Sequence, residues 1–344
     1  MAEDAVREAF LSQAAICAHL GSPFTGLLCA AFSKLDRKTA VSRLILDWQG
    51  DPAADKDNLP LRVCGGLHFL ARSGRAPGLA SLYPPGLLPE ESRLREEVAS
   101  VLALEGDFLV QWFERAPQTN EVGRSALLMS GLLEVSARFP LPIHLFELGA
   151  SAGLNLQLDR FYHDLGGRRF GDRRSKVRLG PDWQGPPPPE AEVRITRRSG
   201  VDVSPIDIAS DGERLLAYVW PDQPARLERT AAALEIARSH PIRIAAADAA
   251  DWLEGKLDLR PVEGVARVIL HSIAFQYFSE PTQARIQARI TAAGECATEQ
   301  APVAWLRFEW LSGEPSASLR LRTWPGEERL LAWGHPHGSK VKWL

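Results

Sequence analysis

Cysteine is scarce in this sequence of 344 residues, and the thiols that occur form no cluster. The four cysteines are widely spaced, and no two of them make a C-x-x-C pair: Cys17, Cys29, Cys64 and Cys296. Such spacing lacks the signature of a structural zinc site and that of a disulfide-stapled secreted domain. We therefore expect a reducing compartment, the cytoplasm, and no metal ion.

Long apolar runs and an excess of one charge are missing as well. The longest apolar stretch, residues 24–32, is far short of the about 20 residues that cross a bilayer. Acidic Glu3 and Asp4 stand where a signal peptide would be basic. The net charge is −3, whereas nucleic-acid-binding proteins usually carry a basic excess. We expect neither a membrane nor a nucleic acid as partner.

The composition is that of a globular chain, with 45% apolar and 24% charged residues, and the length suggests roughly two domains. Up to about residue 138 the apolar positions follow helical spacing. Val6, Phe10, Ala14 and Cys17 share one helix face, and a second helical pattern covers residues 91–114. A third begins near Thr119, which we expect to cap that helix. We predict an α-helical N-terminal region over residues 1–118.

After Pro140 short apolar runs alternate with helical patterns, which is typical of a mostly parallel sheet covered on both faces. The last two runs flank a Pro-Gly turn and predict a closing antiparallel hairpin. The Pro-rich stretch 185–189 lies in a long insertion at about 164–192. We predict a seven-stranded α/β domain over 119–344, with strands at 143–147, 193–202, 242–247, 265–271, 302–310, 319–324 and 329–333 and helices at 153–163, 226–240 and 281–293.

The most informative segment is a strand, a loop of small residues and a helix at residues 145–156. Gly149 and Gly153 let the backbone turn sharply and let a ligand approach the main chain. Glu147 ends the strand, where open α/β sheets bind ligands. Because Ser151 replaces the middle glycine of G-x-G-x-x-G, the dinucleotide fingerprint is imperfect. A carboxylate before the loop favours S-adenosylmethionine, which carries an ammonium group and no phosphate.

Two other interpretations of this segment stay open. Gly149-x-Ser151-x-Gly153 also reads as the nucleophile elbow G-x-S-x-G of serine hydrolases, with Asp248 and either His271 or His335 following in the required order. No several-stranded sheet and no oxyanion loop precede the serine, however. A loop that only packs a helix on a strand is equally compatible with these residues.

Acidic residues follow three successive predicted strands. Asp202, after the second strand, is placed to accept both hydroxyls of a ribose. Asp248, after the third, is placed to bind an exocyclic amine of adenine, and Trp252 lies nearby. Three carboxylates at one edge of a sheet, including Glu147, favour a nucleoside-bearing cofactor over simple packing.

This set of motifs resembles the class I S-adenosylmethionine-dependent methyltransferase superfamily over residues 119–344. Glu147-x-Gly149-x-x-x-Gly153 looks like its first motif, and Asp202 and Asp248 lie in stretches that look like its second and third. More narrowly, the chain resembles the bacterial domain-of-unknown-function family 2332 through the segments 117–125, 147–155, 220–223 and 271–277. That second likeness implies no established activity.

The resemblance implies methyl transfer from S-adenosylmethionine to a small-molecule acceptor. It implies that the cofactor lies against Glu147, Gly149, Ser151, Gly153, Asn155, Asp202 and Asp248. The helical N-terminal region would then cover the crevice and select the substrate. A non-catalytic protein that binds a metabolite or a partner on the same fold remains an alternative.

Several further residues are candidates for handling the substrate. His271 follows the fourth strand and is a candidate general base, with Gln276 and Tyr277 nearby. Asn120 and Arg124 begin the helix that leads into the first strand, and we expect them at the cofactor edge. His335 and His337 lack a third metal ligand, and we expect them at the edge of the sheet opposite Asp202 and Asp248.

Overall fold

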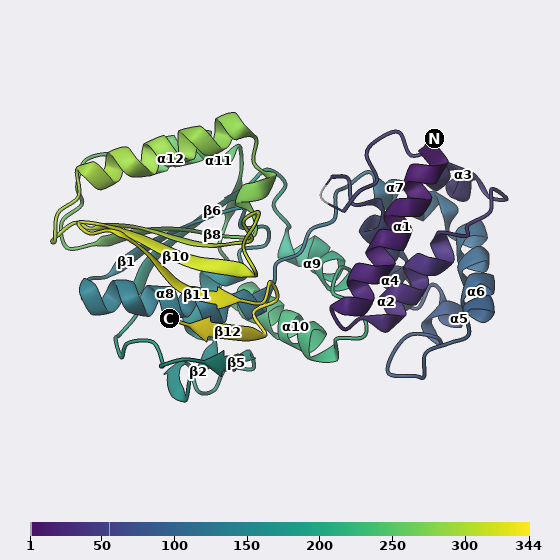
Figure 1. Ribbon diagram of the computed structural model, residues 1–344, viewed down its shortest axis with the longest axis horizontal. Helices are drawn as coiled ribbons and strands as arrows, with labels where there is room; N and C mark the ends of the chain where they lie inside the picture. The colour runs from purple at the N-terminus through teal and green to yellow at the C-terminus, as the bar shows by residue number, and fades with distance from the viewer. Residues whose placement is uncertain (1, 55) are drawn as a thin grey trace. The chain divides into compact units, whose positions relative to one another are not determined.

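The computed structural model describes residues 2–54 and 56–344 and divides the chain into two compact units. Unit 1 comprises Met1–Thr119 and Ser210–Glu228, and unit 2 comprises Asn120–Ala209 and Arg229–Leu344. The mixed α/β architecture is confirmed, with helices first and a large, mostly parallel sheet after them (Figure 1). Ser210–Glu228 belongs to unit 1, although the sequence predicts this segment as part of the α/β domain.

Unit 1 is helical because its apolar residues repeat at helical spacing. In α1 (Ala2–His19) the buried side chains include Val6, Phe10 and Cys17, as the spacing predicts. The pattern at 91–114 forms two helices rather than one, because the chain turns at Glu105. The remaining helices of the first segment are α2 (Pro23–Phe32), α3 (Ala40–Leu46), α4 (Leu59–Arg72), α5 (Pro77–Ala80), α6 (Glu91–Leu104) and α7 (Gly106–Phe113).

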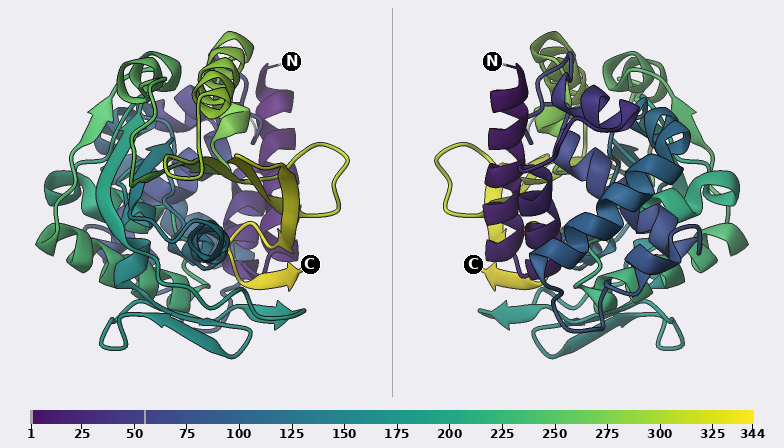
Figure 2. Two further views of the ribbon diagram at one scale, coloured as in Figure 1. Left: turned by 90° about the vertical axis from the view of Figure 1, so that its left-hand side faces the viewer. Right: turned by 90° about the vertical axis from the view of Figure 1, so that its right-hand side faces the viewer.

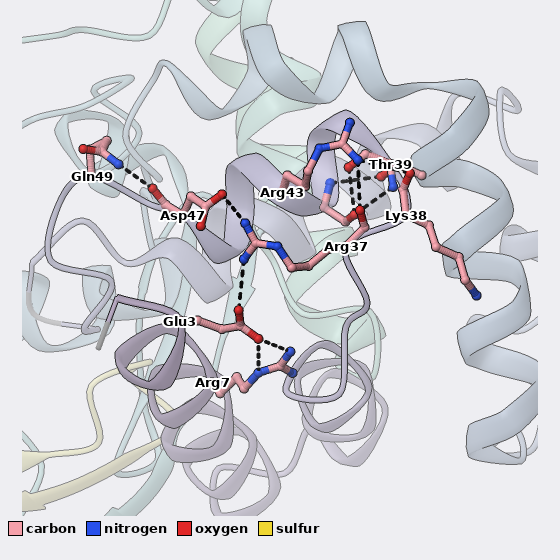
Figure 3. Close-up of polar contacts among 9 residues, drawn as sticks. Glu3, Arg7, Arg37, Lys38, Thr39, Arg43, Asp47 and Gln49 are labelled. Atoms are coloured by element: carbon pink, nitrogen blue, oxygen red, sulfur yellow. Dashed lines mark hydrogen bonds and ion pairs between the residues drawn. The ribbon is translucent and has the colours of Figure 1, made fainter.

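A polar network ties α1 to the start of α3 (Figure 3). Arg37 bonds Glu3 at 2.9 Å and Asp47 at 2.5 Å, and Arg7 also bonds Glu3. Thr39 caps α3 by accepting a hydrogen bond from the Ser42 amide. These groups are solvent-exposed in large part, so their ion pairs contribute little to stability.

The large sheet of unit 2 has nine strands in the order β5-β12-β11-β10-β9-β8-β1-β6-β7. Five neighbouring strands, from β9 to β7, are parallel, and β10 and β11 form the predicted antiparallel hairpin. All seven predicted strands are present: β1 (Ile143–Leu148), β6 (Ile195–Asp202), β7 (Ile244–Ala246), β8 (Ala266–Ser272), β9 (Val303–Glu309), β10 (Ala317–Trp324) and β11 (Glu328–Gly334).

The prediction of seven strands is nevertheless wrong, because two short strands extend the sheet. These are β12 (Lys340–Trp343) and β5 (Asp182–Gln184), and the second pairs in parallel with the first. The insertion also holds β3 (Arg168–Gly171) and β4 (Arg178–Leu179), which flank β2 (Tyr162–Leu165) in a separate three-stranded sheet. The insertion therefore contains several short strands, and its Pro-rich stretch follows β5.

Helices cover both faces of the large sheet, as Figures 1 and 2 show. One face carries α11 (Ala249–Lys256) and α12 (Glu280–Glu295), and the other carries α8 (Ser125–Arg138). The strand β8 is buried along its whole length, as expected for a parallel strand covered on both faces. Two further helices, α9 (Ile208–Ala217) and α10 (Pro224–Ser239), lie between β6 and β7 in the chain.

Two local predictions around β1 are wrong. Residues 153–163 form a short 3-10 helix, Asn155–Arg160, and then enter β2. Their apolar positions alternate at Leu154, Leu156 and Leu158, which does not suit an α-helix. Thr119 does not cap the helix before β1. A 3-10 turn over Val122–Arg124 precedes α8, and Glu121 caps that turn by accepting a hydrogen bond from the Gly123 amide.

Candidate functional site

The candidate site lies where the order of the parallel strands reverses. β1 has β6 on one side and β8 on the other, and their carboxyl ends meet at one edge, here called the carboxyl edge. In open α/β sheets, ligands bind outside these ends at such a switch point. Two loops meet there, one that follows β1 and one that follows β8.

The loop after β1 requires its glycines. Gly149 and Gly153 have φ angles of +68° and +71°, a region that disfavours other residues. A Cβ atom at Gly149 would lie 2.6 Å from the Cβ atom of Ala274, in the loop after β8. Ser151 adopts a φ of 52° between the two glycines, although it has a side chain. The loop is therefore strained at its centre and tightly packed at its start.

Glu147 is buried near the end of β1, two residues before Gly149, with 1% of its surface exposed. Its Oε2 atom has no hydrogen-bond partner within the described part of the chain. Burial raises the pKa of the carboxyl group to about 8, against the lowering effects of a hydrogen bond from Asn155 and of the charge of Arg124. A buried acid that lacks a donor for one oxygen is suited to a cationic ligand.

Asp202 and Asp248 lie at the ends of β6 and β7, as predicted, and both bond the backbone. Asp202 accepts hydrogen bonds from the amides of Ser151 and Ser204, each at 2.9 Å. Asp248 caps α11 by accepting from the Ala250 amide, and it also accepts from the Thr282 hydroxyl. Both carboxylates are partly exposed. Each has a structural role besides any contact with a ligand.

Two predicted asparagines are buried and hold the same loop. Asn120 Oδ1 accepts a hydrogen bond from the Leu154 amide at 2.9 Å. Asn155 Oδ1 accepts from the hydroxyl of Ser125, the first residue of α8. With 8% and 1% exposure, respectively, these asparagines anchor the loop to the start of α8.

The other predicted substrate residues lie at the same edge. Arg124 donates to the carbonyl of Ser272 at 2.8 Å and to that of Pro336 at 2.9 Å. Its guanidinium therefore sits at the end of β8. Gln276 and Tyr277 belong to the 3-10 turn Phe275–Tyr277 after β8, and both side chains are exposed.

His271 is fully buried on β8, so its position does not suit a general base, which must reach the substrate. Its Nδ1 atom lies 2.5 Å from Oε1 of Glu309, and its Nε2 atom accepts a hydrogen bond from the Trp305 indole. An indole N–H only donates, so in the neutral ring Nδ1 carries the proton. Both nitrogens are engaged within the core.

Glu309 is the residue of this edge that sequence reasoning missed. It ends β9, lies 38 positions from His271 and belongs to no motif. Its Oε1 atom also accepts the amides of Ala274 and Phe275, at 3.1 and 3.2 Å. Only the pairing of β8 with β9 brings these groups together.

The predicted position of the histidine pair is wrong. Both β9 and β11 pair antiparallel with β10, so they run in the same direction. His335 and His337, which follow β11, therefore lie at the carboxyl edge and not opposite it. Their rings are 5.1 Å apart, and the intervening Pro336 contacts Arg124.

A serine hydrolase would need a base at Ser151. The Ser151 side chain is buried, and its hydroxyl has no hydrogen-bond partner among residues 2–54 and 56–344. The candidate partners Asp248 and His271 bond other groups, as described above. The strained φ of Ser151 is the one feature here that resembles a nucleophile elbow.

Unit 1 has a buried polar cluster that no motif indicated. His68 stacks on Tyr83 and bonds the carbonyl of Ala217 at 3.0 Å. Burial lowers the pKa of His68 to about 4. The cavity beside these rings has room for about one water molecule, too little for a cofactor.

Among the described residues, no group of three or more His, Cys, Asp and Glu side chains is arranged to hold a metal ion. In the same part of the chain, no helix has the length and apolar character that a membrane crossing requires.

Residues 7–343 match a family described as an uncharacterized protein conserved in bacteria (DUF2332). The chain belongs to this family. The match covers both units and confirms the narrower of the two resemblances. The comparison with curated proteins gave no match, and neither did the comparison with solved structures.

Proposed function

We propose that unit 2 binds S-adenosylmethionine at the carboxyl edge and transfers its methyl group to a small-molecule acceptor in the cytoplasm. The observation that carries the proposal is Glu147. The Oε2 atom of this carboxyl group is buried and has no hydrogen-bond partner among residues 2–54 and 56–344, and the group stands near the end of β1, just before the glycine loop. That position suits the ammonium group of the cofactor.

The neighbouring residues fit such a cofactor. Asp202 is partly exposed at the end of β6, where the strand order of nucleotide-binding folds places the ribose. Its two backbone bonds hold the carboxylate in place, and carboxylate oxygens accept further donors. Asp248 at the end of β7 would face the adenine.

When bound, S-adenosylmethionine supplies an electrophilic methyl group on a positively charged sulfur. The protein contributes mainly position. Glu147 would hold the amino-acid end, and the loop from Gly149 to Gly153 would line it. Asp202 would hold the ribose, so that the methyl group faces the acceptor. Arg124, Gln276 and Tyr277 lie at the same edge and would contact the acceptor.

Calorimetric titration with S-adenosylmethionine and S-adenosylhomocysteine tests this proposal. The wild-type protein should bind both with micromolar affinity. Asp202→Asn should weaken binding of both by about tenfold or more, the cost of one charged hydrogen bond. Asp258→Asn is the matched control, because Asp258 also accepts a backbone amide, from Arg260, but precedes β8 at the opposite edge. Wild-type protein that binds neither compound at millimolar concentration would overturn the proposal.

The variant Ser151→Ala distinguishes methyl transfer from the alternative function, serine hydrolysis, which the strained φ of Ser151 favours. A methyltransferase loop should tolerate the smaller side chain and keep its affinity for S-adenosylhomocysteine. A hydrolase would lose turnover of an ester substrate completely. Retained cofactor affinity in this variant, together with no esterase activity in the wild type, would exclude the alternative.

A further inference from the structure

The two loops at the switch point, one after β1 and one after β8, each contain a residue other than glycine with a positive φ angle. In the part of the chain that the structure describes, three residues other than glycine have positive φ angles: Asn58, Ser151 and Ile273. Two of these lie at the carboxyl edge, Ser151 in the loop after β1 and Ile273 in the loop after β8. For a β-branched residue such as Ile273, a φ of 47° is a true outlier.

Each strained loop is held by a carboxylate from the end of the neighbouring strand. Asp202, which ends β6, accepts the amide of Ser151 itself. Glu309, which ends β9, accepts the two amides that follow Ile273, those of Ala274 and Phe275. Strained conformations persist where surrounding contacts over-determine them, and they concentrate at functional sites.

His271 also helps to fix the loop after β8. It donates Nδ1–H to the oxygen of Glu309 that also receives both amides, and its ring stacks on Phe275 with 4.8 Å between centroids. The Ile273 amide bonds the Phe308 carbonyl, and Gln283 donates to the carbonyl of Phe275. The loop that carries Gln276 and Tyr277 is thus fixed from inside the protein.

The geometry points to His271 and Glu309 as a buried positioning pair, which sets the Ile273–Phe278 loop as one wall of the site. Through Ala274 this wall lies against Gly149, so its position also sets the start of the loop after β1. His271 thus serves as a positioning residue and not as a base. The identity of the ligand rests on the proposed function, whereas the positioning of the loop does not.

Amide hydrogen exchange of the ligand-free protein tests the positioning. Glu309→Ala should speed exchange at Ala274 and Phe275 by about tenfold or more, because both amides lose their acceptor. Glu309→Gln keeps an acceptor oxygen and should restore most of the protection. Ser318→Ala is the matched control. Ser318 pairs with Glu309 in register, is equally buried, and its hydroxyl bonds no described residue.

A second variant separates loop position from general stability. Glycine takes a φ of 47° without strain, so adding Ile273→Gly to Glu309→Ala should bring the loop back to its native position. Affinity for S-adenosylhomocysteine should fall about tenfold in Glu309→Ala and recover in the double variant. Urea unfolding of both variants is measured alongside, because a glycine at a positive φ also relieves backbone strain, and the recovery of affinity should exceed what the recovery of stability explains.

The outcomes keep the two proposals apart. Unchanged exchange at Ala274 and Phe275 in Glu309→Ala would overturn the positioning pair, whatever the protein binds. Unchanged affinity for S-adenosylhomocysteine in that variant would overturn its role in the site. If the wild type binds no S-adenosylhomocysteine, the proposed function fails, and the exchange rates alone decide the positioning.

Discussion

Gly149 lies directly against Ala274, so that a Cβ atom added at 149 would come within 2.6 Å of the Ala274 Cβ atom. This contact joins the loop after the central strand β1 to the loop after β8. Both loops follow the carboxyl ends of parallel strands at the point where the strand order reverses. The contact between the two loops therefore lies at the candidate site.

Gly149→Ala should destabilise unit 2 by about 2–5 kcal/mol, because it adds a steric clash to an unfavourable φ. Gly264→Ala is the control, since Gly264 has a similar φ of +75° and nothing within 4 Å of an added Cβ. That variant should lose only about 1–2 kcal/mol. Urea unfolding of both variants measures the difference, and equal losses would contradict the close packing.

Glu147 should make stability depend on pH. The folded pKa of about 8 lies above the ordinary value of 4.5, so the folded state holds a proton that the unfolded state has lost. Stability should therefore fall as pH rises from 4.5 to 8, by roughly 4–5 kcal/mol, and then level off.

Glu147→Gln should remove this part of the pH dependence and be the more stable protein at pH 8. Urea unfolding at pH 5, 6, 7 and 8 provides the comparison. The exposed Glu254, changed to Gln, serves as control. A hydrogen bond from Arg285 lowers the pKa of Glu254, so this variant should leave the slope between pH 5 and 8 unchanged. Parallel profiles for wild type and Glu147→Gln would show that the carboxyl group is ionised in the folded protein.

His68 should have the opposite effect in unit 1. Its folded pKa of about 4 lies below the ordinary 6.5, so the folded state keeps the ring neutral where the unfolded state gains a proton. Stability should be lost as pH falls from 6.5 to 4, by roughly 3 kcal/mol. His68→Gln should flatten this limb of the profile, and His19→Gln, at an exposed position of the same unit, serves as control.

The sequence was most informative where a motif is local. The glycine loop and the acidic strand ends could be found because strand, turn and carboxylate follow one another within a few residues. The strands of the sheet were found in the same way, from short apolar runs. β5 and β12 were missed because their sequences, Asp-Trp-Gln and Lys-Val-Lys-Trp, contain no run of consecutive apolar residues.

The long-range part of the site could not be predicted. Glu309 meets His271 only through strand pairing, and nothing in the local sequence marks it. Ile273 was missed because turns with positive φ are expected at glycine, not at a β-branched residue. The error at His335 arose from the direction of the hairpin strands, since β11 runs parallel to β9 and ends at the carboxyl edge, toward which the parallel strands point.

The most direct test of the account is the number of protons released when S-adenosylhomocysteine binds. Its ammonium group should favour the ionised form of Glu147, which is mostly protonated at pH 7 in the free protein. Calorimetric titrations at pH 7, in buffers of different ionisation enthalpy, should show release of close to one proton. The release should vanish in Glu147→Gln. Binding without proton release in the wild type, or with the same release in the variant, would contradict the account.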